Sequence, residues 1–298
     1  MPELPEVERV RLSLEAALLG RRVEGVAIHR ADVIQPIASK KAMPAALLLS
    51  ERVRSILRHG KQLAIVADGE GQPEEQARCI CVHLGMTGSL IVAPSSSTLP
   101  PAAAHTHVTW QLDNGSRLTF RDPRRFGGIW TFPSLQALKA ERWRALGNDA
   151  LFIAPASLHE VLRQTSRSLK AALLDQQLIA GLGNIYVDEL LFELGLHPMM
   201  PARRLRLPQV EAMVSAMRAL LNRAIGGGGS SLRDYVDGNG QAGQFQLQHQ
   251  VYGRSGKPCL RCASPLRSRT IAGRTTVFCR QCQRRSPGRQ ALKRDIDR

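Results

Sequence analysis

Residues 259–282 read CLRCASPLRSRTIAGRTTVFCRQC, and the spacing of their cysteines decides the fold of this end of the chain. Two Cys-x2-Cys pairs offer four thiolates at a spacing that closes one tetrahedral site, and four sulfurs leave no coordination position open. The pattern predicts one structural Zn²⁺ held by four cysteines, Cys259, Cys262, Cys279 and Cys282. Two disulfides, or an iron site on the same sulfurs, are the alternatives.

Between the two cysteine pairs, IAGRTTVF (271–278) contains a glycine followed by a short run typical of a β-strand. We expect a β-hairpin whose exposed face carries Arg274. Small zinc hairpins with arginines are a common nucleic-acid-binding module. Taken alone, however, Arg274 is one basic residue among many.

Basic residues exceed acidic ones over the whole chain of 298 residues, 41 Lys and Arg against 25 Asp and Glu, which gives a net charge of +16. From Gly253 to Arg298 there are 13 Lys and Arg against two Asp. Such a charge predicts a polyanionic partner. No apolar run is long enough for a membrane span, and the first residues lack a signal-peptide pattern, so we expect a cytoplasmic protein.

Upstream of the zinc motif, residues 138–226 show helical periodicity, which predicts a mostly α-helical domain. Within it, GLGNIYVDELLF (181–192) places a glycine-rich turn directly before a helix that begins at Asn184. Backbone N–H groups at such a helix start attract an anion such as a DNA phosphate. A helix-turn-helix that Asn184 simply caps is the alternative. The Gly-rich stretch 237–250 that follows is either a mobile lid or a linker.

The first part of the chain consists of short runs with a period of two, such as LAIVADG (63–69) and SRLTFRD (116–122), and predicts a β-rich domain that ends near residue 135. Residues 69–78 and 94–104 are polar or rich in proline, and we expect surface loops there. Cys79 and Cys81 lie two apart in an alternating stretch and are interpreted as residues on one face of a buried strand.

The chain opens with MPELPEVE (1–8), in which Pro5 suits the first turn of a helix, and Glu6 and Glu8 complement the positive end of its dipole. Apolar residues at helical spacing continue to Leu19, and Gly20 ends the pattern. We expect a helix from about Pro5 to Leu19.

Two loops offer residues for base stacking. RDPRRFGG (121–128) presents Arg124, Arg125 and Phe126 in succession, and a guanidinium beside an aromatic ring can fill a gap in a base stack. A hairpin turn with solvated arginines is the alternative. Met86, in HLGMTG (83–88), is by itself more typical of a core residue, and Lys61, after a glycine turn, of a surface lysine.

His105 and His107 lie two residues apart, and we expect both on one face of a strand. Because no third ligand lies nearby, a metal site is disfavoured. A phosphate contact or a solvated histidine is the preferred interpretation.

Seven stretches, taken together and in order, resemble the bacterial formamidopyrimidine-DNA glycosylase family. They are MPELPEVE (1–8), HGK (59–61), HLGMTGSL (83–90), DPRRFG (122–127), LLDQQLIAGLGNIYVDE (173–189), QVYGRSGKPC (250–259) and the zinc motif. The resemblance covers residues 1 to about 283. Each stretch is ambiguous alone, but an unrelated chain would hardly contain all seven.

The resemblance implies an α+β fold: an N-terminal β-sandwich with flanking helices, a helical helix-two-turn-helix domain and a zinc β-hairpin finger. The domain limits that we predict are 1–138 for the catalytic β-sandwich, 139–245 for the helix-two-turn-helix domain with its base-capping loop, 246–285 for the zinc finger and 286–298 for a basic, disordered tail.

The implied activity is that of a base-excision-repair enzyme which acts, as a monomer, on double-stranded DNA containing oxidised bases. Such an enzyme removes 8-oxoguanine and ring-opened formamidopyrimidines and then cuts the strand at the abasic site. By the resemblance, the nucleophile is the amine of Pro2, a secondary amine that becomes free once Met1 is removed, and Glu3 is the adjacent general acid/base.

The resemblance assigns further roles. Glu6 lies near the sugar, Lys61 aids base release, and Arg274 grips phosphate during δ-elimination. The hole left by the flipped nucleotide is filled by Met86, Arg124 and Phe126. Phosphate contacts that bend the DNA fall to His105, Arg125, Lys170 and Asn184. Residues 231–246 match the loop that covers the extruded purine.

The chain departs from the family in QTSRSLK (164–170), where the family has a lysine-rich turn. A phosphate contact at Ser166 is therefore not expected, and Arg163 or Arg167 is the candidate to make that contact in its place. Two other functions also stay open: an endonuclease VIII-like glycosylase for oxidised pyrimidines, and a zinc-finger DNA-binding protein without catalysis.

Overall fold

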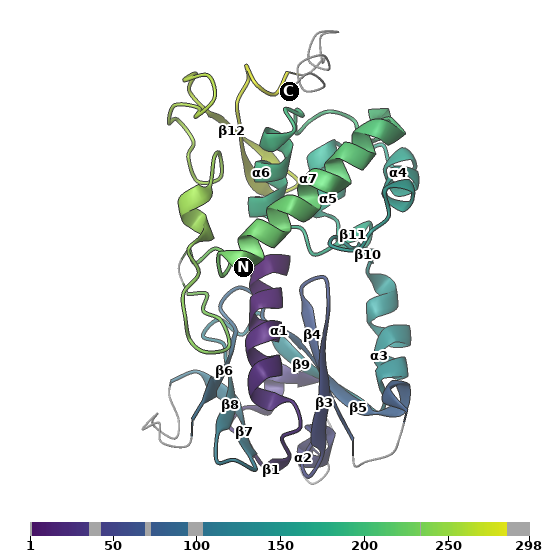
Figure 1. The fold of residues 1–298 in the computed structure, drawn as a ribbon, viewed down its shortest axis with the longest axis vertical. Coiled ribbons are helices and arrows are strands. Elements are labelled where there is room, and N and C mark those ends of the chain that lie inside the picture. Colours follow the sequence, from purple (N-terminus) through teal and green to yellow (C-terminus); the bar gives the residue numbers. More distant parts are fainter. Residues whose placement is uncertain (1, 36–42, 69–72, 95–103, 233, 285–298) are drawn as a thin grey trace. The chain divides into compact units, whose positions relative to one another are not determined.

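A computed structural model describes residues 2–35, 43–68, 73–94, 104–232 and 234–284. The predicted loop at 94–104 lies almost entirely outside these residues, as do residues 69–72 and the tail at 286–298. The chain forms two compact units, residues 1–147 with 222–247, and residues 148–221 with 248–298 (Figure 1). The domain limits expected from the sequence stay predictions.

The first unit contains two β-sheets. One has the order β1 (Val23–Ile28), β7 (Thr106–Leu112), β8 (Arg117–Arg121), β6 (Ser89–Ala93). The other has the order β2 (Ile34–Gln35), β9 (Gly128–Phe132), β5 (Arg78–His83), β4 (Gln62–Asp68), β3 (Arg52–His59). All neighbours are antiparallel except β2 and β9.

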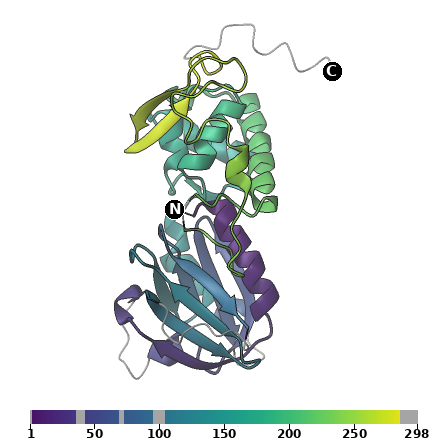
Figure 2. The ribbon, with the colours of Figure 1, turned by 90° about the vertical axis from the view of Figure 1, so that its left-hand side faces the viewer.

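Apolar side chains of both sheets share one core, so the predicted β-sandwich is confirmed. Trp110 of β7, Phe120 of β8 and Ile65 of β4 belong to it, and period-two burial explains why these strands alternate in sequence. Helix α1 (Leu4–Leu18) closes the core with residues such as Val10 and Leu14, and lies alongside β3, β4 and β6 (Figures 1 and 2).

Helix α3 (Leu135–Glu141) covers the outer face of the five-stranded sheet. Cys79 and Cys81 point to this face of β5 and pack with Leu135 and Leu138, as the alternating pattern predicted. Burial raises the pKa of the Cys81 thiol to about 11. Both cysteines are therefore protonated packing groups near neutral pH.

The remaining short elements of this unit are η1 (Ala31–Val33), α2 (Met43–Ala46), η2 (Glu74–Gln76), η3 (Trp143–Ala145) and η5 (Phe245–Gln248), whose last residue is counted with the second unit. From Asn222, inside α7 (Leu207–Gly226), to Leu247 the chain again belongs to the first unit.

The second unit is mostly helical, as expected, with a zinc-type hairpin at its end. Its elements are β10 (Asn148–Asp149), α4 (Pro155–Arg163), α5 (Leu169–Leu174), β11 (Ile179–Ala180), α6 (Asn184–Glu193), η4 (Ala202–Arg204), most of α7, β12 (Arg267–Ile271) and β13 (Arg274–Phe278). Every residue of α6 from Ile185 to Phe192 is buried, so this helix is the centre of the unit. Among the described residues, none of the helices has the length and apolar character needed to span a lipid bilayer.

Candidate active site

The N-terminus is held by a capping box. Glu3 is the N-cap of α1, its backbone N–H donates to Glu6 Oε2 at 2.8 Å, and its own side chain accepts from the N–H of Glu6. The expected helix is confirmed, although it begins at Leu4 and ends at Leu18. Pro2, Glu3 and Glu6 are all buried, with exposed fractions of 3% for Glu3 and 1% for Glu6. The capping box thus fixes the backbone directly beside Pro2.

Glu6 also joins this end of the chain to residues far away in sequence. Its Oε1 accepts a 2.7 Å hydrogen bond from the backbone N–H of Ser230. The Tyr235 hydroxyl lies 3.1 Å from Glu6 O and 3.2 Å from Gly228 O. The segment that matches the base-capping loop is therefore packed against the first turn of α1, which sequence reasoning did not foresee.

Lys61 follows the turn between β3 and β4 and is only 8% exposed, so its interpretation as an ordinary surface lysine was wrong. The turn is tied to α1 by Arg58, whose Nε donates to Glu8 Oε2 at 2.7 Å and whose guanidinium donates to Gly60 O at 2.9 Å. The Arg58 side chain is 2% exposed. This buried link sets the turn that carries Lys61 relative to the helix that begins just after Pro2 and Glu3.

His83 is a further titratable group beside Lys61. It stands opposite Gln62 in the pairing of β4 with β5. Burial, assisted by the positive charges of Arg142 and Lys61, lowers the pKa of His83 to about 4. The imidazole is therefore neutral near pH 7, and the positive charges in this part of the unit belong to Lys61 and Arg142.

The two loops with stacking residues are joined by Asp122, which is fully buried. Asp122 Oδ1 accepts from the Thr87 hydroxyl at 2.5 Å, and Oδ2 accepts from the backbone N–H of Gly127 at 2.7 Å. Gly85 lies so close to the backbone of Phe126 and Gly127 that a Cβ there would come within 2.4 Å. Only glycine allows the two loops to approach in this way.

These loops expose their apolar residues. Met86 is 39% exposed and Phe126 55%, and the Arg124 guanidinium stacks over the Phe126 ring at 4.6 Å. Met86 is therefore a surface residue, and its interpretation as core was wrong. Exposed apolar side chains on fixed loops are suited to entering a base stack.

His105 and Arg125 are exposed, and both have positive φ, +71° and +54°. The backbone connects them through Asp122, whose N–H donates to His105 O and whose carbonyl accepts from Arg125 N–H. His107 instead lies inside β7 and is 1% exposed, with Nε2 donating to Asp122 O at 2.8 Å. The prediction that the two histidines share one strand face was wrong, because the turn at His105 and a register shift after Thr106 break the alternation.

In the second unit, Lys170 and Asn184 form one cluster with Asp188. Lys170 is fully buried, and its Nζ lies 2.5 Å from Asp188 Oδ1 and 2.6 Å from Asn184 Oδ1. In this position Lys170 orients the Asn184 amide, and its contact with a phosphate stays a prediction. The cap of α6 is Gly183, so Asn184 is not a simple helix cap.

The same cluster holds the hairpin that carries Arg274. Asn184 Nδ2 donates to Thr275 O at 2.9 Å, and Asp188 Oδ2 accepts from Val277 N–H at 2.9 Å. Burial raises the pKa of Asp188 to about 6, with Lys170 acting in the opposite direction. Sequence reasoning missed Asp188, although a carboxylate within the apolar run NIYVDELLF was a usable signal because buried charges need partners.

Arg274 begins β13, directly after the two-residue turn Ala272–Gly273, and is exposed, as predicted. Both turn residues have positive φ, +48° and +69°, as a tight hairpin turn requires. The loop that enters the finger is held by Glu189, which accepts the backbone N–H groups of Gln250, Val251 and Tyr252.

The four predicted zinc ligands are brought together. Their Sγ atoms all lie within 4.8 Å of one another, with 3.9 Å between Cys259 and Cys282 and 3.5 Å between Cys262 and Cys279. Zn–S bonds of about 2.3 Å in a tetrahedron place sulfurs about 3.8 Å apart. The cluster therefore fits one structural Zn²⁺, and none of the four is in a disulfide.

The predicted site residues are divided between the units. The first holds Pro2, Glu3, Glu6, Lys61, Met86, His105, Arg124, Arg125 and Phe126. The second holds Lys170, Asn184, Arg274 and the four cysteines.

Comparison with known proteins covers most of the chain. Residues 1–129 match the formamidopyrimidine-DNA glycosylase N-terminal domain, residues 146–236 the H2TH domain of the same glycosylase, and residues 256–285 a zinc finger found in FPG and IleRS. The formamidopyrimidine-DNA glycosylase of Geobacillus kaustophilus is 40% identical over 286 residues, which are 95% of this chain and 100% of the relative.

Solved structures agree. Wild-type Lactococcus lactis Fpg (MutM) in complex with DNA containing N7-benzyl-Fapy-dG is similar with a TM-score of 0.82 and 30% identity, over 95% of this chain and 100% of that one. MutM in complex with DNA containing carbocyclic 8-oxo-G has a TM-score of 0.81 and 30% identity, over the same shares of the two chains. With all three domains matched in order and the relatives covered in full, the chain belongs to the formamidopyrimidine-DNA glycosylase family.

Proposed function

We propose that this protein is a bifunctional DNA glycosylase and AP lyase that excises oxidised purines and then cuts the strand by β,δ-elimination. The observation that carries the proposal is the buried capping box that holds Pro2 and Glu3 and joins them to the segment around Ser230. The similar structures contain DNA with Fapy-dG and 8-oxo-G lesions, which supports purines as the substrate class.

The nucleophile that we propose is the amine of Pro2, freed by removal of Met1. An α-amino group titrates near pH 8, so a useful fraction is neutral at pH 7. The nitrogen bonds to C1′ of the deoxyribose as the C1′–base bond breaks, and the base leaves with the electron pair and takes up a proton. The attached nitrogen then loses its proton, the C1′–O4′ bond breaks as O4′ takes up a proton, and the opened sugar carries an iminium ion. Because a secondary amine leaves no N–H on the iminium, the cation cannot be neutralised there.

The iminium draws electrons from C2′ and acidifies its hydrogens. Loss of a C2′ proton expels the 3′ phosphate, and a second elimination expels the 5′ phosphate. Glu3, held beside Pro2 by the capping box, is the proposed group that exchanges these protons. Lys61 aids departure of the base, and Arg274 holds the phosphate that leaves in the δ-elimination.

DNA binding follows from the exposed residues of both units. Met86, Arg124 and Phe126 fill the space left by the extruded nucleotide, and His105, Arg125 and Asn184 contact phosphates. Lys170 acts in this proposal through Asn184, which it orients, and Glu6 acts by holding Glu3. Zinc, when bound by the four cysteines, fixes the hairpin that presents Arg274. We further propose that the protein acts as a monomer in the bacterial cytoplasm.

Borohydride trapping on defined lesions tests this function. With 8-oxoguanine opposite cytosine, reduction should give a covalent protein–DNA adduct, and Pro2→Gly should abolish it. Protein that retains Met1, identified by its intact mass, should form no adduct. A clear preference for thymine glycol would instead assign the endonuclease VIII-like activity. Lesion binding without any adduct would assign a DNA-binding protein without catalysis.

A further inference from the structure

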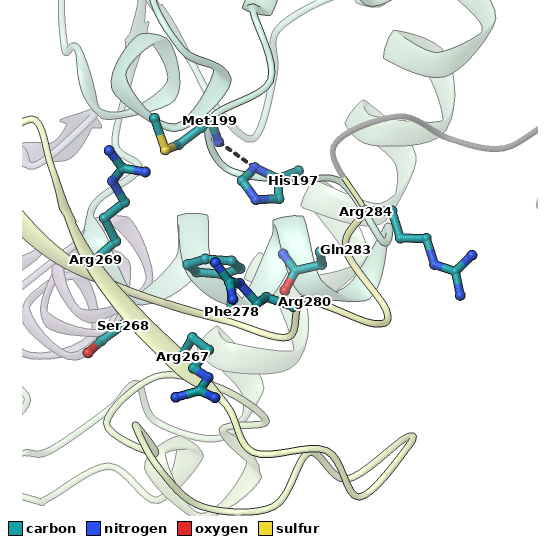
Figure 3. A pocket seen from close by; sticks show the side chains of 9 residues that line it. All are labelled: His197, Met199, Arg267, Ser268, Arg269, Phe278, Arg280, Gln283 and Arg284. Carbon is teal, nitrogen blue, oxygen red and sulfur yellow. Dashed lines mark hydrogen bonds between the residues drawn. The ribbon is translucent and has the colours of Figure 1, made fainter.

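A hollow of about 850 Å³ lies on the second unit beside the zinc hairpin (Figure 3). Its lining comes from β12, from the residues around Cys279 and Cys282, and from the loop after α6. The described residues that line it are His197, Met199, Arg267, Ser268, Arg269, Phe278, Arg280, Gln283 and Arg284. Four are arginines and none is acidic, so the hollow is complementary to an anion.

The guanidinium N–H groups of the four arginines are accessible to an anion in the hollow. Arg267, Arg269, Arg280 and Arg284 are all exposed. Within the described part of the chain, the side chains of Arg267, Arg269 and Arg280 make no hydrogen bond or ion pair, and Arg284 donates only to Gln281 O. A guanidinium presents a planar fork of N–H donors that matches a phosphate.

The floor of the hollow is formed by buried side chains that are held in place by other residues, whereas the arginines around it are exposed. Phe278 is 6% exposed and meets the His197 ring edge-on at 5.0 Å. Gln283 is 1% exposed, with Nε2 donating to Leu196 O and Oε1 accepting from Cys279 N–H. The hollow therefore exists before any ligand arrives, which lowers the ordering cost of binding.

The strand register aligns two of these arginines with Arg274. Arg267 stands opposite Phe278, Arg269 opposite Thr276, and Ile271 opposite Arg274. Because residues directly opposite one another share a face and residues two apart on a strand do also, Arg267, Arg269 and Arg274 lie on one face of the hairpin. Residues two apart are about 6.7 Å apart along a strand. The charges thus form a row, which suits a linear chain of phosphates better than a single small anion.

We propose that this hollow, with Arg267 and Arg269 as its main contacts, binds backbone phosphates of duplex DNA that flank the lesion, beyond those held by Arg274. The proposal rests on the proposed function for the role of Arg274, and it adds a second DNA-binding surface on the same hairpin. Binding of phosphates in the hollow raises the affinity for long DNA and leaves the excision chemistry unchanged.

The double variant Arg267→Gln/Arg269→Gln tests the proposal against the matched control Arg203→Gln/Arg204→Gln. The control removes the same charge from two exposed arginines of the same unit that do not line the hollow. Affinity is measured as a function of salt for two lesion duplexes, one that ends close to the lesion and one extended by at least a helical turn on each side. Zinc content confirms an intact finger in both variants.

For the extended duplex, loss of two phosphate contacts should reduce the slope of log K against log salt by about 2, and weaken binding at low salt by about tenfold relative to the control. Affinity for the short duplex and the single-turnover rate of base excision should be unchanged. An equal slope for variant and control on the extended duplex would overturn the proposal. A further measurement asks whether polyglutamate competes with DNA for the protein. If the variant keeps the control's slope but polyglutamate no longer competes, the proposal is also overturned, because that outcome assigns the hollow to an acidic protein partner.

The salt slope on undamaged duplex separates the two proposals. If the protein forms no adduct on any lesion, the proposed function fails, yet the slope difference between the variants still tests the hollow. If excision is normal and the slopes agree, only the hollow is refuted.

Discussion

Glu6 Oε1 accepts a 2.7 Å hydrogen bond from the backbone N–H of Ser230, 224 positions along the chain. The other oxygen of the same carboxylate accepts the N–H of Glu3 at 2.8 Å. One buried side chain thus fixes both the residue beside Pro2 and the residue directly before the segment that matches the base-capping loop. A carboxylate suits this task because both oxygens are acceptors.

Glu6→Gln should disrupt this junction. The amide can accept only one of the two N–H groups and leaves the other unpaired in a buried place, which costs about 1–3 kcal/mol of the free energy of unfolding. Adduct formation with borohydride should slow as Pro2 and Glu3 lose their fixed position, while affinity for an abasic-site analogue changes little. Glu15→Gln is the control, since Glu15 pairs with Arg11 on the helix surface. Equal trapping rates in both variants would contradict the role of Glu6.

Arg58→Met should separate α1 from the turn that carries Lys61. Arg58 joins Glu8 to Gly60 O from a buried position, and a displacement of about 1 Å near a reacting group can cost about 100-fold in rate. We expect a single-turnover excision rate about 10- to 100-fold lower. Arg54→Met is the control on the same strand, because Arg54 is 41% exposed and pairs with Asp68. Arg58→Lys should recover part of the rate, and a wild-type rate for Arg58→Met would refute the positioning role.

Asp188→Asn should weaken the junction between α6 and the zinc hairpin. The amide oxygen can still accept from Val277 N–H, but Lys170 loses its buried ion pair with Asp188, and breaking such a pair costs about 3–5 kcal/mol of the free energy of unfolding. Denaturant unfolding of the zinc-loaded protein measures this loss. Glu211→Gln, an exposed acid on α7, makes the same charge change and should leave the stability within about 0.5 kcal/mol. Comparable stability of the two variants would show that the ion pair is unimportant.

His83 should make stability depend on pH. Its pKa is lowered to about 4 in the folded protein, against about 6.5 unfolded, so the unfolded chain binds the additional proton between these values. The stabilisation is complete above about pH 6.5 and is lost as pH falls toward 4, and it amounts to about 2 kcal/mol between pH 7 and pH 5. His83→Gln should remove this part of the dependence in unfolding measured at both pH values. An identical pH dependence for variant and wild type would contradict the burial of a neutral imidazole.

The local features of this protein were determined by its sequence. Cysteine spacing specified the metal site because two Cys-x2-Cys knuckles joined by a short hairpin bring four sulfurs together through local geometry. The helix that begins beside Pro5, the turn before Arg274 and the buried pair Cys79 and Cys81 were predicted for the same reason. Helix caps, hairpin turns and strand alternation depend on neighbours within a few residues.

The environment of single side chains was decided only by the tertiary structure. Taken alone, Lys61 was expected at the surface and Met86 in the core, but Lys61 is buried and Met86 is exposed. Burial depends on which loops pack against one another, and this is set by the tertiary structure. Lys170 is enclosed by Asp188 and Asn184, and the shared face predicted for His105 and His107 is broken by a turn with positive φ. The junction of Glu6 with Ser230 joins positions 224 residues apart. No local pattern carries that information, since the free energy that selects it comes from burying polar groups with partners brought from elsewhere in the fold.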